Sequence, residues 1–209
     1  MRPVDELYVE FGEPVAAASM AQVHPALVRQ PDGSVRKMAV KVLRPDVARR
    51  FNNDLQSFYL VARLAERFVP AARRLRPIAV VDTLARSVAL EMDFRLEAAA
   101  LSEMAENTAE DPGFRVPAVD WMRSAKGVLT MEWIDGRKLS DVAGITEDGM
   151  DLEALGANVI QSFLRHTLRD GFFHADMHQG NLFVQPDGTL VAVDFGITGR
   201  LGRAERRFL

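Results

Sequence analysis

Cysteine is absent from the 209 residues of this chain, which excludes disulfide scaffolds, thiolate zinc sites and cysteine nucleophiles. Long apolar runs are missing as well, since no stretch approaches the ~18 residues that a membrane-spanning helix requires. The N-terminal segment MRPVDELYVEFGEP has neither the basic start nor the apolar core of a signal peptide. We therefore expect a cytoplasmic chain with no transmembrane segment.

Charge of one sign is not in excess, because 26 Lys and Arg face 29 Asp and Glu, for a net charge of −3. A nucleic-acid partner held by bulk positive charge is therefore not expected. Hydrophobic residues make up 48% of the chain and charged residues 26%, which is typical of a folded soluble domain. The length suffices for one well-buried domain or two small lobes.

The first half of the chain predicts a sheet followed by helices. Val15 to Val23 is a stretch of small residues, and Lys37 to Leu43 has the alternating, β-branched pattern of a strand. Between them, Gln30-Pro31-Asp32-Gly33 combines residues typical of a tight turn. Helical patterns run from Asp46 to about Phe68 and, as one continuous helix, from about Val80 to Glu106.

The second half predicts short strands around one amphipathic helix. Strand patterns occur at about Arg115 to Trp121 and Gly127 to Ile134, and a short hairpin spans Leu182 to Val193. Asp151 is suited to begin the helix and Gly171 to end it. We expect a sheet-rich lobe over residues 1–134 and a helical lobe over residues 135–209, with a crevice where they join.

An ordered set of polar residues has the composition of a phosphoryl-transfer site. Lys41 lies on a predicted strand, Asp176 and Asn181 lie in the loop HADMHQGN, and Asp194 opens an Asp-Phe-Gly tripeptide. In phosphoryl transfer a lysine neutralises phosphate charge, an aspartate and an asparagine hold Mg²⁺, and a second aspartate orients the incoming hydroxyl or water. The two loops correspond to kinase signatures that are weak singly and strong together in this order.

At the level of whole motifs the chain resembles the UbiB (AarF) family of atypical, protein-kinase-like ATPases associated with ubiquinone biosynthesis. The family's blocks occur in its order as VAAASMAQVH (15–24), MAVKVLRP (38–45), EMDFRLEA (91–98), FHADMHQGNLFV (173–184) and VDFG (193–196). The resemblance implies an α+β, protein-kinase-like bilobal fold, with a sheet-rich N-lobe, a long helix and a truncated helical C-lobe. It also implies ATP or ADP with Mg²⁺ as cofactors.

The resemblance implies a role for each matching residue. Lys41 would contact the nucleotide phosphates, with Glu97 as its ion-pair partner. Asp176 would be the catalytic aspartate, and Asn181 and Asp194 would be the metal ligands.

Further roles follow for the flanking blocks. Glu91 and Asp93 would form the ExD pair that is particular to the family, and the backbone of Glu132 to Ile134 could contact adenine between the lobes. The nucleotide-binding loop would consist of Val15, Ala16, Ala17, Ala18, Ser19, Met20, Ala21, Gln22 and Val23. Its alanines carry a Cβ where kinase loops have glycine, so we expect this loop to contact the nucleotide phosphates differently. We also expect weak or absent phosphorylation of generic protein substrates.

Structural explanations compete with these assignments. Lys41 could protect an edge strand, although the apolar residues on both sides of it favour a position facing a cleft. Glu91, Asp93 and Glu97 could form a solvated helix face, on which Asp93 and Glu97 would repel each other unless cations meet them. His174 is expected to be a hydrogen-bonded loop residue rather than a base.

Three functions remain open. The first is an ATP- and Mg²⁺-dependent kinase or ATPase that supports ubiquinone (coenzyme Q) biosynthesis. The second is a nucleotide-gated, non-catalytic scaffold for biosynthetic partners. The third is a small-molecule phosphotransferase, which the alanine-rich loop and the EMDFRLEA block disfavour.

The family resemblance also implies partners and a location. They are a lipid or quinone precursor, enzymes of ubiquinone biosynthesis, and the inner face of the membrane for the full-length protein. The family's KxGQ segment has no match here, and the chain ends soon after Asp194-Phe195-Gly196, so we expect a fragment of a longer protein.

Overall fold

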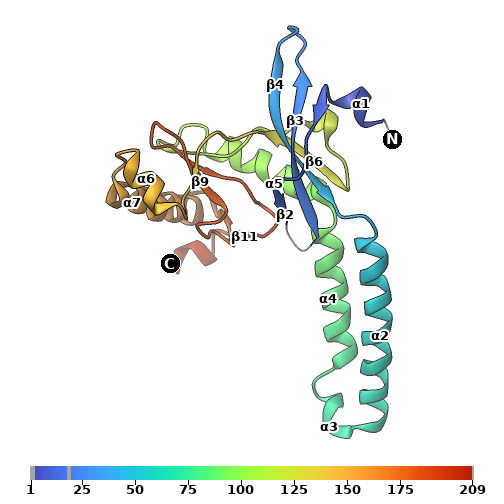
Figure 1. Ribbon diagram of the computed structural model, residues 1–209. Helices are drawn as coiled ribbons and strands as arrows, with labels where there is room; N and C mark the ends of the chain where they lie inside the picture. The colour runs from blue at the N-terminus through green and yellow to red at the C-terminus, as the bar shows by residue number, and fades with distance from the viewer. Residues whose placement is uncertain (1–2, 18–19, 209) are drawn as a thin grey trace.

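The computed structural model describes residues 3–17 and 20–208, so Ala18 and Ser19 of the expected nucleotide loop lie outside the described residues. Three sheets and a set of helices make up the fold (Figure 1). The first sheet contains β1 (Glu10–Phe11), β2 (Ala16–Ala17), β3 (Ala21–Arg29), β4 (Val35–Leu43) and β6 (Val128–Glu132). Its order is β1-β3-β4-β6, with β2 also paired to β3.

A second sheet has the order β5-β10-β9-β7. Its strands are β5 (Phe114–Arg115), β7 (Arg137–Lys138), β9 (Leu182–Val184) and β10 (Leu190–Ala192), and a third, two-stranded sheet pairs β8 (Phe172–His174) with β11 (Thr198–Arg200). The helices are α1 (Val4–Leu7), α2 (Val47–Phe68), α3 (Pro70–Arg73), α4 (Pro77–Glu91), α5 (Phe94–Asn107), α6 (Val142–Glu147) and α7 (Leu152–Arg165). A π-helical turn, His166–Asp170, continues α7, and 3-10 turns lie at Trp121–Arg123 and Glu205–Arg207.

The β3–β4 hairpin follows the sequence expectation. Gly33 takes φ +86°, a conformation that glycine adopts without steric cost, and its N–H donates to the carbonyl of Gln30 at 3.0 Å. Strand β4 lies between β3 and β6, with Lys41 opposite Val23 on one side and Leu129 on the other. The alternative of Lys41 as an edge-strand residue is therefore wrong.

The expected helix from Val80 to Glu106 is wrong in its continuity, because two helices occupy this range. The break falls at Met92 and Asp93, where the Asp93 carboxylate accepts from the backbone N–H of Arg95 at 3.2 Å and caps α5. The Asp93 side chain can accept a hydrogen bond from the backbone and so begin a new helix. The helical spacing of the apolar residues continues across the break, so the pattern alone does not show it. Asp93 therefore precedes α5 instead of sharing a face with Glu97.

Other boundaries also differ from the sequence expectation. The strand expected from Arg115 to Trp121 is wrong over most of its length, because β5 includes only Phe114 and Arg115, and a 3-10 turn begins at Trp121. The helix expected to begin after Asp151 is confirmed as α7, where the Asp151 side chain accepts from the N–H groups of Glu153 and Ala154. Gly171 ends the following turn at φ +67°.

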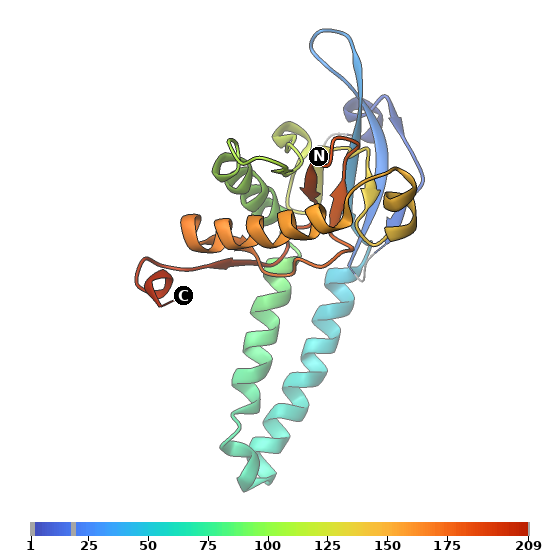
Figure 2. The same ribbon diagram turned by 90° about the vertical axis from the view of Figure 1, so that its left-hand side faces the viewer.

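Helices α2 and α4 form an antiparallel hairpin that projects away from the rest of the molecule (Figures 1 and 2). Small and branched side chains, Ala62 of α2 and Val81 of α4, are buried. The hydroxyl of Tyr59 on α2 donates to the carboxylate of Asp82 on α4 at 2.7 Å. The hairpin is thus joined along its length but leaves much of its surface uncovered.

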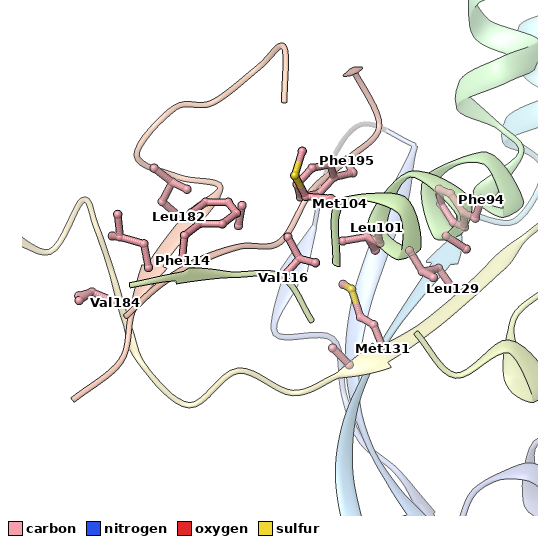
Figure 3. Packing of buried hydrophobic residues seen from close by; sticks show 14 of the residues in the cluster. Phe94, Leu101, Met104, Phe114, Val116, Leu129, Met131, Leu182, Val184 and Phe195 are labelled. Carbon is pink, nitrogen blue, oxygen red and sulfur yellow. The ribbon is translucent and has the colours of Figure 1, made fainter. Parts of the chain in front are cut away.

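The main hydrophobic core lies where α5 meets the first two sheets (Figure 3). Leu101 and Met104 of α5 are fully buried, together with Leu129 of β6 and Leu182 of β9. One continuous core thus serves both expected lobes. The division at residue 134 stays a prediction, and the second sheet does not follow it strictly, because β5 precedes residue 134 and pairs with β10.

Candidate active site

A buried ion pair between β4 and α5 forms the centre of the candidate site. The Nζ atom of Lys41 lies 2.8 and 3.0 Å from the two carboxylate oxygens of Glu97. The side chains are 13% and 4% exposed, respectively. Burial raises the pKa of Glu97 even though Lys41 acts against the rise. Burial also acts to lower the pKa of Lys41, but the carboxylates around it outweigh burial and raise that pKa.

Asp194 provides the second carboxylate beside Lys41. One of its oxygens lies 3.3 Å from Nζ of Lys41, and the other accepts from the backbone N–H of Gly196 at 3.1 Å. Burial acts to raise the pKa of Asp194, but Lys41 and the Gly196 N–H outweigh it, so this pKa is lowered. Phe195, which is 1% exposed, fixes the loop in the core and lies with its ring centroid 4.8 Å from that of His174.

The loop between β8 and β9 carries Asp176 and Asn181. His174 is buried, and its Nδ1 accepts from the backbone N–H of Asp176 at 3.0 Å, which confirms that it is hydrogen-bonded, although it ends strand β8 instead of lying in the loop. Burial lowers the pKa of His174, which favours the neutral imidazole that this bond needs. Nδ2 of Asn181 donates to the carbonyl of Asp176 at 3.2 Å. The two polar side chains are thereby held on one rigid loop.

Two neighbouring cavities meet at these residues. The smaller, of about 280 Å³, is lined by polar residues from both halves of the chain, among them Lys41, Glu91, Glu97, Asp176, Asn181 and Asp194. The larger, of about 410 Å³, is more apolar and is lined in part by Ala39, Met131, Trp133, Phe183 and Val193. Lys41, Asn181 and Asp194 border both. The smaller, charged cavity therefore adjoins the larger, apolar cavity, and Lys41 lies on the border between them.

The expected nucleotide loop lies over the larger cavity. Ala16 and Ala17 form β2 and pair with Val23 and Gln22 of β3, and Val15 donates its N–H to the carbonyl of Val23 at 2.9 Å. Among the described residues of this loop, those that border one of the two cavities are Val15, Ala16, Ala17, Met20, Ala21 and Val23. Gln22 borders neither of the two, because side chains alternate along a strand.

The segment between the lobes borders the larger cavity through Glu132 and Ile134. The carboxylate of Glu132 is engaged elsewhere, accepting from Arg115 at 2.9 and 3.2 Å. Its backbone N–H donates to the carbonyl of Ala118 at 2.8 Å. Contact of Glu132 with a ligand would therefore have to use its carbonyl oxygen, and the assignment of adenine to this segment stays a prediction.

The two residues of the ExD pair have separate surroundings. Glu91 ends α4 and borders the smaller cavity. Asp93 caps α5 and pairs with the guanidinium of Arg95 at 2.6 Å. The cations that meet Asp93 and Glu97 are thus different ones, Arg95 and Lys41.

Sequence reasoning did not assign several cavity residues. Trp133, whose side chain was given no role, borders the larger cavity, and the Nζ of Lys37 lies over its ring at 3.8 Å from the centroid. Phe94 and Ile197 border the smaller cavity. Two features of the sequence could have indicated these positions: Trp133 is an aromatic residue beside Glu132, and Ile197 is a large apolar residue directly after Gly196.

The donor set suits a hard divalent cation. Within the described residues no group of three or more His, Asp or Glu side chains is arranged to hold a metal by itself. Asp194 offers a carboxylate, and the Asn181 amide, with its nitrogen donating to Asp176, offers its oxygen. Mg²⁺ prefers oxygen ligands and commonly completes its shell with phosphate oxygens and water, so these two residues fit Mg²⁺ that arrives with a nucleotide.

Comparison with known proteins places this geometry in a family. The model of the ABC1 atypical kinase-like domain matches residues 1–209. Two curated proteins named "Probable protein kinase UbiB" are similar: one from Marinobacter nauticus at 38% identity over 212 residues and one from Azotobacter vinelandii at 39% over 211 residues. Each alignment covers 99% of this chain and 38% of the relative, so the chain spans well under half the length of these proteins.

A solved structure supports the same placement. The complex of Rv3197 with erythromycin, from Mycobacterium tuberculosis, superposes with a TM-score of 0.67 at 32% identity. The match covers 93% of this chain and 48% of the other. The α+β arrangement of sheet, ion-paired lysine, catalytic-type loop and Asp-Phe-Gly segment is a protein-kinase-like fold, and the chain belongs to the ABC1 atypical kinase-like family.

Proposed function

We propose that the chain binds ATP with Mg²⁺ in the two adjoining cavities and acts as an unorthodox kinase or ATPase supporting ubiquinone biosynthesis. One observation carries the proposal: Lys41 is held by Glu97 and Asp194 at the border between an apolar compartment and a charged one. An adenine ring suits the apolar compartment, and phosphates suit the charged one. The names of the UbiB relatives support the link to ubiquinone.

Each residue then has a distinct task. Lys41, oriented by Glu97, neutralises phosphate charge, and Asp176 orients the hydroxyl or water that attacks. Asp194 and Asn181 would hold Mg²⁺, which neutralises the charge that develops on the phosphates during transfer. Water or a hydroxyl group on a lipid, a quinone precursor or a partner protein is the acceptor that this site could serve.

The β2–β3 turn favours hydrolysis or an unusual acceptor over generic protein phosphorylation. Ala16 and Ala17 hold β2 against β3 by strand pairing, and each carries a Cβ that a glycine would lack, which restricts how closely the backbone can approach phosphate. We propose that the backbone of this loop contacts the nucleotide phosphates less closely than the glycine-rich loop of ordinary kinases does. Association of the full-length protein with the inner face of the membrane is part of the same proposal, and within the described residues no helix is both long and apolar enough to cross a bilayer.

A thermal-shift experiment tests nucleotide binding. MgATP or MgADP at ~100 times Kd should raise the melting temperature by about 5–10 °C, and EDTA should remove the rise. Asp194→Asn should abolish the shift, whereas Asp54→Asn, which makes the same chemical change at an exposed site on α2, should retain it. A well-folded protein that melts at the same temperature with and without MgATP would contradict the proposal.

Phosphate release separates catalysis from scaffolding. Asp176→Asn should bind MgATP with a normal thermal shift but release phosphate at least ~100-fold more slowly, because proton transfer by a positioned carboxylate is worth that factor. Binding without turnover, unchanged in Asp176→Asn, would instead favour the nucleotide-gated scaffold.

A further inference from the structure

The outer end of the α2–α4 hairpin is a surface that phosphoryl transfer does not use. We define this hairpin tip as residues 60–80, which include the end of α2, all of α3 and the start of α4. Both views show the tip at the far end of the projection, away from the sheets and from the candidate active site (Figures 1 and 2).

Charge is strongly segregated to the hairpin tip. Residues 60–80 hold five arginines and one glutamate, a net charge of +4, in a chain whose net charge is −3. The remainder of the chain therefore carries −7, which is −3 less +4. The five arginines are Arg63, Arg67, Arg73, Arg74 and Arg76, and all five are exposed. An anionic partner would be drawn to the tip and repelled by the rest of the molecule.

The arginines are not neutralised by neighbouring acids. Across residues 3–17 and 20–208, no ion pair joins any of the five to a carboxylate. The guanidinium of Arg73 instead donates to the carbonyl of Glu66 at 2.7 Å, and the Glu66 carboxylate accepts from the backbone N–H of Ile78 at 3.3 Å. The single acid of the tip is thus used to join α2 to α4.

Large apolar side chains are exposed among the arginines. Phe68, the last residue of α2, is 68% exposed, and Leu75, in the turn between α3 and α4, is 70% exposed. The other exposed apolar residues of the tip are Leu60, Val61, Leu64, Val69 and Val80. The guanidinium of Arg67 lies 5.5 Å from the ring centroid of Phe68, so cationic and aromatic groups occupy the same patch.

We propose that the hairpin tip docks on the surface of an anionic lipid bilayer. Arginines interspersed with aromatic and branched apolar residues are the composition that lies in a membrane interface, with the cations on headgroup phosphates and the apolar groups in the acyl boundary. The proposal deepens the membrane association proposed above, on which it rests. A protein partner would need a surface that is both acidic and apolar, whereas every anionic bilayer offers both.

The fold connects this surface to the active site. Helix α2 has 22 residues, so at 1.5 Å per residue it is about 33 Å long. Its first residues follow β4, the strand of Lys41, and α4 ends at Glu91 on the wall of the smaller cavity. The hairpin would therefore hold the catalytic half of the molecule away from the bilayer, at a distance set by the helix.

Vesicle sedimentation tests the docking surface with the 209-residue chain. Vesicles of phosphatidylcholine alone and vesicles with 30% phosphatidylglycerol should differ, the anionic ones binding at least about tenfold more tightly at low salt. Arg67→Glu/Arg74→Glu should weaken binding to anionic vesicles by about tenfold or more. Arg203→Glu/Arg207→Glu makes the same charge change at exposed residues near the C-terminus and should bind like the parent chain.

The apolar part of the surface is tested separately. Phe68→Ser/Leu75→Ser should weaken binding at high salt, where screening leaves the apolar contribution dominant. Phe208→Ser, at a residue 91% exposed, is the matched control. Circular dichroism melts check that each variant is folded.

Three outcomes would overturn the proposal. One is equal binding of the parent chain to neutral and anionic vesicles, or to neither. Another is that the tip variants still bind anionic vesicles tightly while Arg203→Glu/Arg207→Glu loses binding. Membrane association would then stand, but the C-terminal surface and not the hairpin tip would carry it. The third is a dimer in sedimentation velocity that dissociates on Phe68→Ser/Leu75→Ser, which would make the tip a contact between copies. Nucleotide thermal shifts in the tip variants should stay unchanged, so failure of the docking surface is distinguishable from failure of the nucleotide site.

Discussion

Lys41 and Glu97 lie 56 residues apart in the sequence and form the shorter of the two ion pairs that Lys41 makes, with Nζ 2.8 Å from a Glu97 oxygen. Strand β4 is in the middle of its sheet and α5 packs against it, so the pair is enclosed on both sides. Phe94, at the start of α5, places its ring centroid 5.4 Å from Nζ and excludes solvent further. The kinase-type lysine is therefore held in place by the hydrophobic core.

Removal of Lys41 should destabilise the fold as well as abolish nucleotide binding. Lys41→Met leaves the Glu97 carboxylate buried without a cation, which should lower the free energy of unfolding by about 3–5 kcal/mol at pH 7. Burial already raises the pKa of Glu97, so the deficit should shrink as the pH falls and Glu97 takes up a proton. Urea denaturation at pH 7 and pH 5 measures both effects.

The double variant Lys41→Met/Glu97→Leu is the control for this prediction. With the buried Glu97 carboxylate also removed, it should recover most of the lost stability, while its thermal shift with MgATP should remain absent. A single Lys41→Met variant as stable as the parent chain would show that the pair is not enclosed in solution.

The sequence predicted which residues meet at the candidate site better than the path of the chain around it. Lys41, Asp176, Asn181 and Asp194 were found because each belongs to a motif whose spacing is fixed by local structure. The break before α5 was missed because the apolar period continues through Asp93, and only the side-chain bond to Arg95 shows that the helix restarts there.

Long-range pairing was beyond the reach of the sequence for a different reason. β5 is only two residues long, and its place beside β10 depends on contacts with residues more than seventy positions away. The engagement of Glu132 by Arg115 depends on the same pairing, so its carboxylate could not have been excluded from the nucleotide site beforehand.

Arg115 should prove to be a structural link between the two larger sheets. Its guanidinium donates to both oxygens of Glu132 and, through Nε, to the side chain of Gln185 at 2.9 Å. Arg115→Met should lower the free energy of unfolding by about 1–3 kcal/mol, because a half-buried carboxylate loses its forked partner. Arg115→Lys should recover only part of the loss, since an ammonium cannot form the fork.

Arg36 offers the matched control, because it also faces Glu132, at 3.4 Å, but is 53% exposed. Arg36→Met should cost less than about 1 kcal/mol in the same urea titration. Burial acts to raise the pKa of Glu132, but Arg115 outweighs it and this pKa is lowered. The stabilisation by Arg115 should therefore be present above pH ~4.5 and be lost as the pH falls further. Equal losses of stability in Arg115→Met and Arg36→Met would contradict the role of Arg115 as a link between the sheets.

His174 should make the stability of the chain depend on pH near neutrality. Burial lowers its pKa, and its Nδ1 must stay unprotonated to accept from the N–H of Asp176. As the pH falls below ~6.5, the unfolded chain takes up a proton at this histidine that the folded chain does not, so folding stability decreases. The contribution of one such histidine is at most about 1.4 kcal/mol per pH unit. Urea denaturation between pH 7.5 and 5 should accordingly show a shallower decrease for His174→Leu than for the parent chain.

His166 provides a comparison for the contribution of His174. His166 is also buried with a lowered pKa, so His166→Leu should flatten the profile in the same direction. An identical slope in His174→Leu and the parent chain would mean that His174 takes up protons equally in both states. The Asp176 loop would then not depend on a neutral imidazole at His174.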